Sequence, residues 1–70
     1  MARKKYNLVG IDGNAFAVMG YVRNAMREQG FGAEAIKEYT SSATSSDYNN
    51  LLAVSVFWID ICNAKAKKSK

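Results

Sequence analysis

One helix with a start signal and a stop signal constrains the fold more than any other feature of this chain. We predict this helix over residues 15–29, directly after a turn at 12–14. Asn14 is a good N-cap residue, because its side-chain oxygen accepts hydrogen bonds from the unpaired N–H groups of the first helical turn. Gly30 provides a left-handed C-cap, and Phe31 lies where a Schellman ending places a hydrophobic contact.

The predicted helix 15–29 carries one apolar stripe at three- and four-residue spacing, formed by Ala15, Val18, Met19, Val22, Ala25 and Met26. Gly20 lies inside the helix and costs about 1 kcal/mol relative to alanine. We expect it to mark the close approach of another backbone. Because other elements must cover the stripe, the rest of the chain is expected to pack on this helix.

Two further helices are predicted, over residues 32–44 and from Ser45 or Ser46 to about residue 62. The hydroxyl-rich segment 40–46 has poor helix propensity, so we expect the second helix to fray near Thr44 and a turn to follow. The third helix has a face suited to packing, formed by Tyr48, Leu51, Leu52, Ser55, Val56, Ile59 and Cys62. Residues 53–59 are rich in β-branched and aromatic side chains, which leaves a strand as the alternative there.

The segment from Tyr6 to Ile11 has the composition of a strand, and a buried strand needs a pairing partner. Three arrangements are open: pairing with the C-terminal run, pairing with a second copy, or an extended arm lying on the helices. We predict a mostly α, three-helix domain with an extended N-terminal arm or short strand. The alternative is an α+β fold with Tyr6–Ile11 paired to a C-terminal or intermolecular strand.

Length and composition limit what the chain can be and do. Seventy residues make one domain with a small core. The absence of histidine and the single cysteine, Cys62, exclude an intrachain disulfide, the usual zinc sites and Ser-His or Cys-His nucleophile pairs. The longest apolar run, 51–59, is too short to cross a membrane. We therefore predict a cytoplasmic protein without enzymatic activity, cofactor, metal or transmembrane segment.

A surplus of apolar residues on the third helix indicates a binding surface. Its members are Val54, Phe57, Trp58 and Ile61, which lie away from the face suited to packing. This spacing is typical of a helix that docks on another helix or in a groove. Three coverings are open: the arm at 6–11, a second copy of the chain, or another protein. We predict a protein-interaction module that self-associates through this helix as a homodimer.

Basic residues gather at the two ends of the chain: Arg3, Lys4, Lys5, Lys65, Lys67, Lys68 and Lys70. We expect residues 1–5 and 63–70 to be flexible basic tails flanking a domain at 6–62. Tails of this kind favour solubility, and they also suit the phosphates of a nucleic acid or an anionic membrane surface. Arg23 and Arg27 extend such a patch, but Glu28 dilutes it. A nucleic-acid-binding accessory protein is therefore the alternative function.

Two elements of the chain are Leu8-Val9-Gly10-Ile11-Asp12-Gly13-Asn14-Ala15-Phe16 with Met19-Gly20, and a later Asp47-Tyr48 and Leu51-Leu52 element. In these residues the chain resembles small uncharacterised proteins of bacteria, prophages and mobile elements. The serine-rich stretch 40–46 departs from their pattern. The resemblance implies a short helical domain in a bacterial or phage cytoplasm, and it brings no functional residue with it.

Overall fold

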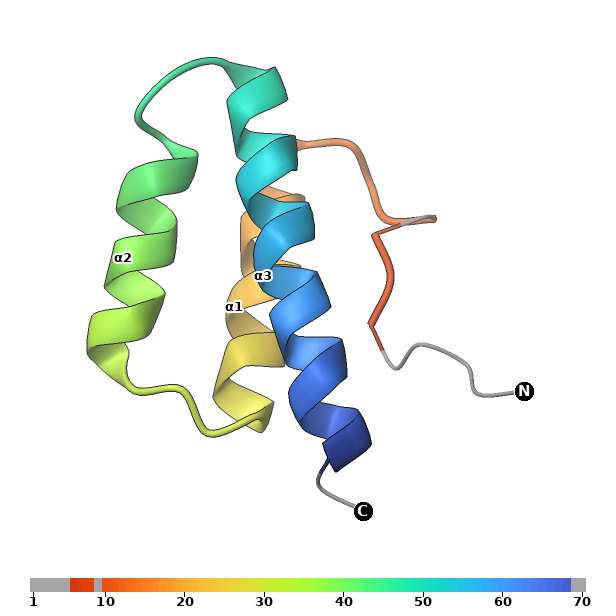
Figure 1. Ribbon diagram of the computed structural model, residues 1–70. Helices are drawn as coiled ribbons and strands as arrows, with labels where there is room; N and C mark the ends of the chain where they lie inside the picture. Colours follow the sequence, from red (N-terminus) through yellow and green to blue (C-terminus); the bar gives the residue numbers. More distant parts are fainter. Residues whose placement is uncertain (1–5, 9, 69–70) are drawn as a thin grey trace.

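The computed structural model describes residues 6–8 and 10–68, which form three helices and no strand. They are α1 (Ala15–Glu28), α2 (Ala33–Ala43) and α3 (Tyr48–Lys68). In Figure 1, α1 lies behind α3, α2 lies along one side of this pair, and the N-terminal arm passes along the other side. The predicted three-helix fold is confirmed, and the α+β alternative is wrong for the described residues.

The two ends of α1 follow the predicted capping chemistry. The Phe16 N–H donates to the Asn14 side-chain oxygen at 2.7 Å. At the other end Gly30 has φ +85°, the Phe31 N–H donates to the Met26 carbonyl, and the Gly30 N–H donates to the Arg27 carbonyl, each at 3.0 Å. These two bonds form the Schellman ending. The helix ends at Glu28, one residue before the predicted end.

The apolar stripe of α1 forms the centre of the core, as predicted. Its members Val18, Met19, Val22, Ala25 and Met26 are buried. The expectation for Gly20 is wrong, because a Cβ atom added there would meet nothing within 4 Å. The helices therefore do not cross closely at this glycine.

Helix α2 ends where its hydroxyl side chains begin to bond their own backbone. The Thr40 hydroxyl donates to the Ile36 carbonyl at 2.9 Å, and the Thr44 hydroxyl donates to the Thr40 carbonyl at 2.8 Å. Ala43 is the last helical residue and Thr44 is the C-cap. The predicted end near Thr44 and the turn after it are confirmed.

Helix α3 differs from the prediction at both ends. Its N-cap is Asp47 and not Ser45 or Ser46, because the Asp47 carboxylate accepts the Asn50 N–H at 3.0 Å. The helix continues to Lys68, so the predicted flexible tail is wrong for residues 63–68. Asn63 and Ala66 are partly buried, and this packing extends the helix. The remaining predicted tail residues, 1–5 and 69–70, lie outside the described residues.

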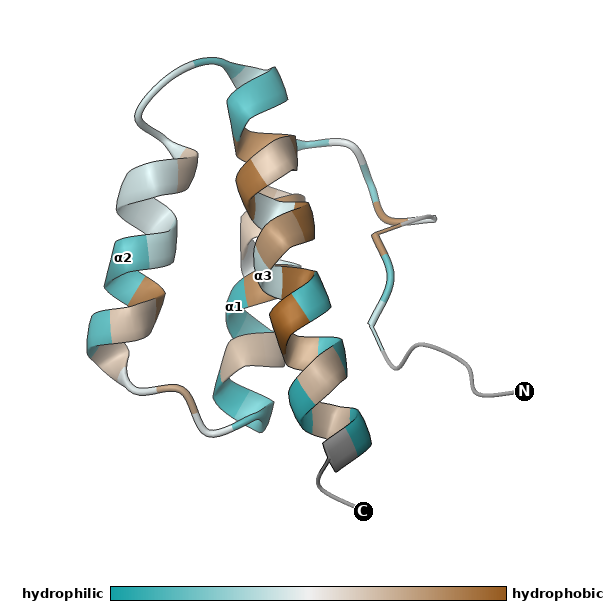
Figure 2. Ribbon diagram, viewed as in Figure 1, coloured by the Kyte–Doolittle hydropathy of each residue, from teal (hydrophilic) through white to brown (hydrophobic). Residues whose placement is uncertain are grey.

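The central residues of α3 are helical and not a strand, because the buried side chains follow the helical period. Leu51, Ser55, Ile59 and Cys62 are buried. The central turns of α3 are also the most hydrophobic part of the ribbon in Figure 2. Within the part of the chain that the structure describes, no helix is both long enough and apolar enough to cross a membrane.

The N-terminal segment lies as an arm on the helices, the third of the predicted arrangements, but it is not extended throughout. Its backbone turns at Gly10, where φ is +89°, and the Ile11 N–H donates to the Leu8 carbonyl at 3.3 Å. The Tyr6 backbone exchanges two hydrogen bonds with the Asn63 side chain, at 2.7 and 3.0 Å. The buried Tyr6 ring meets Tyr21 edge-on, with ring centroids 6.5 Å apart. The Tyr6 hydroxyl donates to the Glu28 carboxylate at 2.7 Å. The arm is thus held on α1 and α3 on the side away from α2 (Figure 1).

Candidate functional site

The predicted interface residues of α3 lie together on one side of the helix, and we call this set the outer face: Val54, Phe57, Trp58 and Ile61. Phe57 is 61% exposed, and the other three side chains are partly buried. The Trp58 ring stands edge-on between two other rings, with its centroid 5.5 Å from that of Phe31 and 6.1 Å from that of Phe57. Trp58 thus contacts the rings of Phe31 and Phe57, and it is less exposed than Phe57.

Helix α2, and not the N-terminal arm, lies beside the outer face. Val54 and Trp58 pack against the edge of the core, and Phe31, in the loop that leads into α2, supports Trp58. The described part of the arm is bonded to Asn63 on the opposite side of α3. Covering by the arm, one of the three open possibilities, is therefore wrong, and Phe57 stays exposed.

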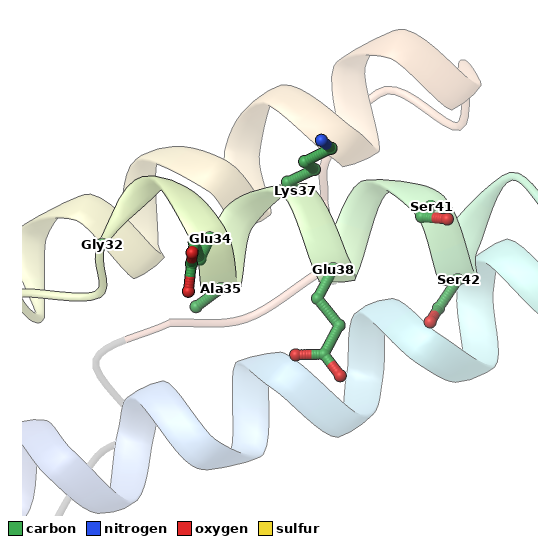
Figure 3. Close-up of a pocket in the computed structure, with 7 residues that line it drawn as sticks. All are labelled: Gly32, Glu34, Ala35, Lys37, Glu38, Ser41 and Ser42. Carbon is green, nitrogen blue, oxygen red and sulfur yellow. The ribbon is translucent and has the colours of Figure 1, made fainter.

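An open groove of about 850 Å³ runs along α2, with Gly32, Glu34, Ala35, Lys37, Glu38, Ser41 and Ser42 as its lining residues. Figure 3 shows the Glu38 and Ser42 side chains pointing toward α3 and Lys37 pointing away from it. On the far side of α3, Asp60 is exposed one turn after Phe57. Carboxylates thus flank the apolar outer face on both sides.

The exposed surface holds three large hydrophobic residues whose exposure the sequence pattern does not predict. Helical spacing assigns Tyr48 and Val56 to the packed face of the third helix, but they are 43% and 48% exposed, because the buried face centres on Leu51, Ser55 and Cys62. Phe16 falls outside every predicted surface, and it is 79% exposed at the start of α1. The sequence signal for this exposure is the position of Phe16 two residues after the N-cap Asn14, because the first turn of a helix is seldom covered on all sides.

A second groove, of about 420 Å³, lies between α1 and α2, and we call it the basic groove. Its lining residues are Arg23, Arg27, Phe31, Ala33, Ile36, Lys37 and Thr40. Every charged residue in this set is cationic. Glu28 does not dilute the charge here as expected, because its carboxylate accepts the Tyr6 hydroxyl on the side of the arm. The sequence pattern places residues 23 and 27 on one face, but only the fold brings Lys37 to them.

The predicted nucleic-acid contacts at the C-terminal end lie on the last turns of α3. The Lys65 ammonium group is 5.2 Å from the centroid of the Phe31 ring, and Lys67 is exposed. Lys68 belongs to the helix by its backbone. Arg3, Lys4, Lys5 and Lys70 lie outside the described residues.

The buried thiol of Cys62 is part of the core. Its side chain is fully buried, and burial raises the pKa of the thiol while the charge of Lys65 lowers it. Within residues 6–8 and 10–68, no three acidic or cysteine side chains lie close enough to hold a metal ion. The outer face and the basic groove are therefore the two candidate sites.

No family model matches the chain, and neither the curated proteins nor the solved structures contain a match. The resemblance to small bacterial and phage proteins stays a prediction.

Proposed function

We propose that the chain is a small, non-enzymatic protein-interaction module of the bacterial or phage cytoplasm, and that it self-associates through the outer face of α3. The observation that carries this proposal is the exposure of Phe57. A phenylalanine with 61% of its surface in water lies in the middle of a row of apolar side chains. Covering this row removes apolar surface from water at about 25 cal/mol per Å².

The spacing along α3 favours a second copy of the chain as the occupant. Val54, Phe57, Ile61 and Ala64 follow one another at intervals of three, four and three residues, the spacing of a two-helix seam. Asp60 and Lys65 border this seam on its two sides, five positions apart. In a parallel dimer, Asp60 of each copy lies next to Lys65 of the other copy, and their opposite charges attract. An identical helix therefore complements this face in both shape and charge.

The size of the seam indicates a weak dimer. Helix α3 has 21 residues and is therefore about 30 Å long. The seam occupies only part of this length. It therefore buries less surface than the roughly 800 Å² per partner that is typical of a stable interface. We expect a dissociation constant in the micromolar range, with an equilibrium between monomer and dimer that depends on concentration.

Sedimentation equilibrium between about 10 and 500 µM tests the proposal. The natural chain should shift from monomer to dimer, and Phe57→Glu should stay monomeric because it places a charge inside the seam. Val56→Glu is the matched control, since it puts the same charge on the same helix at an exposed position outside the seam. Circular dichroism of both variants verifies that the fold is retained.

Two outcomes contradict the proposal. The first is a natural chain that stays monomeric over the whole concentration range. The second is an equal loss of dimer in Phe57→Glu and Val56→Glu, which would locate the contact elsewhere. The fluorescence of Trp58, the single tryptophan, gives an independent readout because its ring contacts Phe57.

A further inference from the structure

Charged side chains are separated around α2. Glu34 and Glu38 line the open groove of about 850 Å³ along α2, and Figure 3 shows Glu38 pointing toward α3. Arg23 and Arg27 line the basic groove between α1 and α2, and Lys37 borders both grooves. One flank of α2 therefore carries both glutamates, and the charged residues on the other flank are all cationic. This separation exists only in the folded chain, because residues 34, 37 and 38 are neighbours in sequence.

The three cations of the basic groove lie on both of its walls. Arg23 and Arg27 lie one turn apart on α1, about 6 Å along the helix axis. Lys37 comes from α2 on the opposite wall. Arg27 donates one weak hydrogen bond to the Asn24 side chain at 3.3 Å, and no carboxylate among the described residues forms an ion pair with the three cations. Their remaining N–H donors are thus not occupied by a carboxylate of the described residues.

Arg23 reaches further into the molecule than Arg27. Its side chain is partly buried, whereas that of Arg27 is exposed. The pKa of Tyr39 is raised by burial, and the hydrogen bond with Ser55 and the positive charge of Arg23 partly offset this rise. Of the two arginines that line the groove, Arg23 is therefore the less exposed to solvent. The charge of Arg23 is partly removed from solvent, so it attracts an anion in the groove more strongly than a fully exposed cation does.

Apolar and aromatic side chains accompany these cations. Phe31, Ala33 and Ile36 line the basic groove together with the cations. Phe16 precedes Arg23 by seven positions and Arg27 by eleven, so all three lie on one face of α1. Its ring is 79% exposed. An open aromatic ring beside a row of cations is the combination by which proteins hold single-stranded nucleic acids, with bases stacked on the ring and phosphates on the cations.

We propose that the basic groove binds single-stranded nucleic acid, with phosphates at Arg23, Arg27 and Lys37 and a base stacked on Phe16. An acidic peptide also suits three cations, but it leaves the exposed Phe16 ring without a role. The site lies on the folded body of the protein and not on its basic ends. It is also distinct from the outer face of α3, so it goes beyond the self-association proposed above.

Fluorescence anisotropy with a labelled oligothymidylate of about 12 nucleotides tests this proposal. The natural chain should bind at about 50 mM salt and more weakly at about 200 mM salt, because bound phosphates release their counterions. The double variant Arg23→Gln/Arg27→Gln should bind about tenfold more weakly. Its slope of log affinity against log salt should be shallower by about 1.4, the value for two lost phosphate contacts to a single strand.

Three further variants test whether the basic groove itself holds the strand. Lys67→Gln/Lys68→Gln removes the same number of charges near the C-terminal end, and it should change the affinity less than threefold. Phe16→Ala should weaken binding about tenfold with an unchanged salt slope, because stacking involves no counterion release. Phe57→Glu should bind normally, which separates this proposal from self-association.

Three results would overturn the proposal. One is an absence of salt-dependent binding of the oligonucleotide by the natural chain. Another is an equal loss of affinity in the Arg23/Arg27 and Lys67/Lys68 double variants, which would assign binding to net charge alone. The third is tighter binding of a labelled polyglutamate peptide of similar length, which would assign the groove to an acidic protein partner.

Discussion

The hydroxyl of Tyr39 and the hydroxyl of Ser55 are hydrogen bonded at 2.7 Å in the core, and both side chains are fully buried. Tyr39 belongs to α2 and Ser55 to α3, so this bond sets how the two helices lie against each other. A buried hydroxyl without a hydrogen-bond partner destabilises a fold. Each of these two hydroxyls therefore needs the other as its partner.

A double-mutant cycle on this pair should show strong coupling. Tyr39→Phe or Ser55→Ala alone leaves one buried hydroxyl without its partner and should cost about 1–3 kcal/mol of unfolding free energy. The double variant should lose less than the sum of the two single losses. Urea unfolding followed by circular dichroism measures all four states. Strictly additive losses would contradict the prediction.

Stability should fall at high pH because three buried groups hold their protons more tightly in the fold. Burial raises the pKa values of Tyr6 and Tyr39 above their ordinary value of 10.0 and that of Cys62 above 9.0. A raised pKa in the folded state contributes stability that is complete below the unfolded pKa and is lost as the pH rises above it. The urea midpoint should therefore be higher at about pH 8 than at about pH 11. Equal midpoints would contradict this expectation, and Tyr39→Phe should flatten the decline.

Asn63→Ala should release the N-terminal arm. The Asn63 side chain makes both backbone hydrogen bonds to Tyr6, so its loss should cost about 1–2 kcal/mol and expose the Tyr6 ring. Hydrogen exchange at the Tyr6 amide and urea unfolding measure the two effects. Asn49→Ala is the control, because Asn49 is an exposed residue of the same helix. An Asn63 variant with the same exchange rate as the natural chain would count against this role of Asn63.

The same substitution at two glycines should have opposite effects. Gly20→Ala lies in the interior of α1 with open space around it and should stabilise the fold by about 0.5–1 kcal/mol. Gly30→Ala forces a side chain into the left-handed region at φ +85° and should destabilise the fold by about 1 kcal/mol. Thermal unfolding of the two variants gives the signs. A destabilising Gly20→Ala would indicate a close neighbour at that position.

Local signals are sufficient where backbone chemistry decides the structure. The Asn14 cap, the Gly30 ending and the buried stripe of α1 follow from residues within one or two helical turns of each other. Predictions fail where a distant residue decides the outcome. The segment 63–68, expected to be a tail, is helical and packs on the core through Ala66, and its Asn63 binds Tyr6, 57 positions away in the chain. Nothing in the local composition of this basic segment signals that bond.

Of the two candidate sites, the outer face was predictable and the basic groove was not. Helical spacing alone places Val54, Phe57 and Ile61 on one side of α3. The groove needs the turn after Gly30, which brings Lys37 of α2 opposite Arg23 and Arg27, and it needs Tyr6 to hold Glu28 on the other side. By itself, then, the sequence determined the helices, their caps and the apolar stripes, because these depend on short-range periodicity and hydrogen bonding. Only the tertiary structure decided which charges meet and which apolar side chains stay exposed, because packing joins residues that lie far apart in the chain.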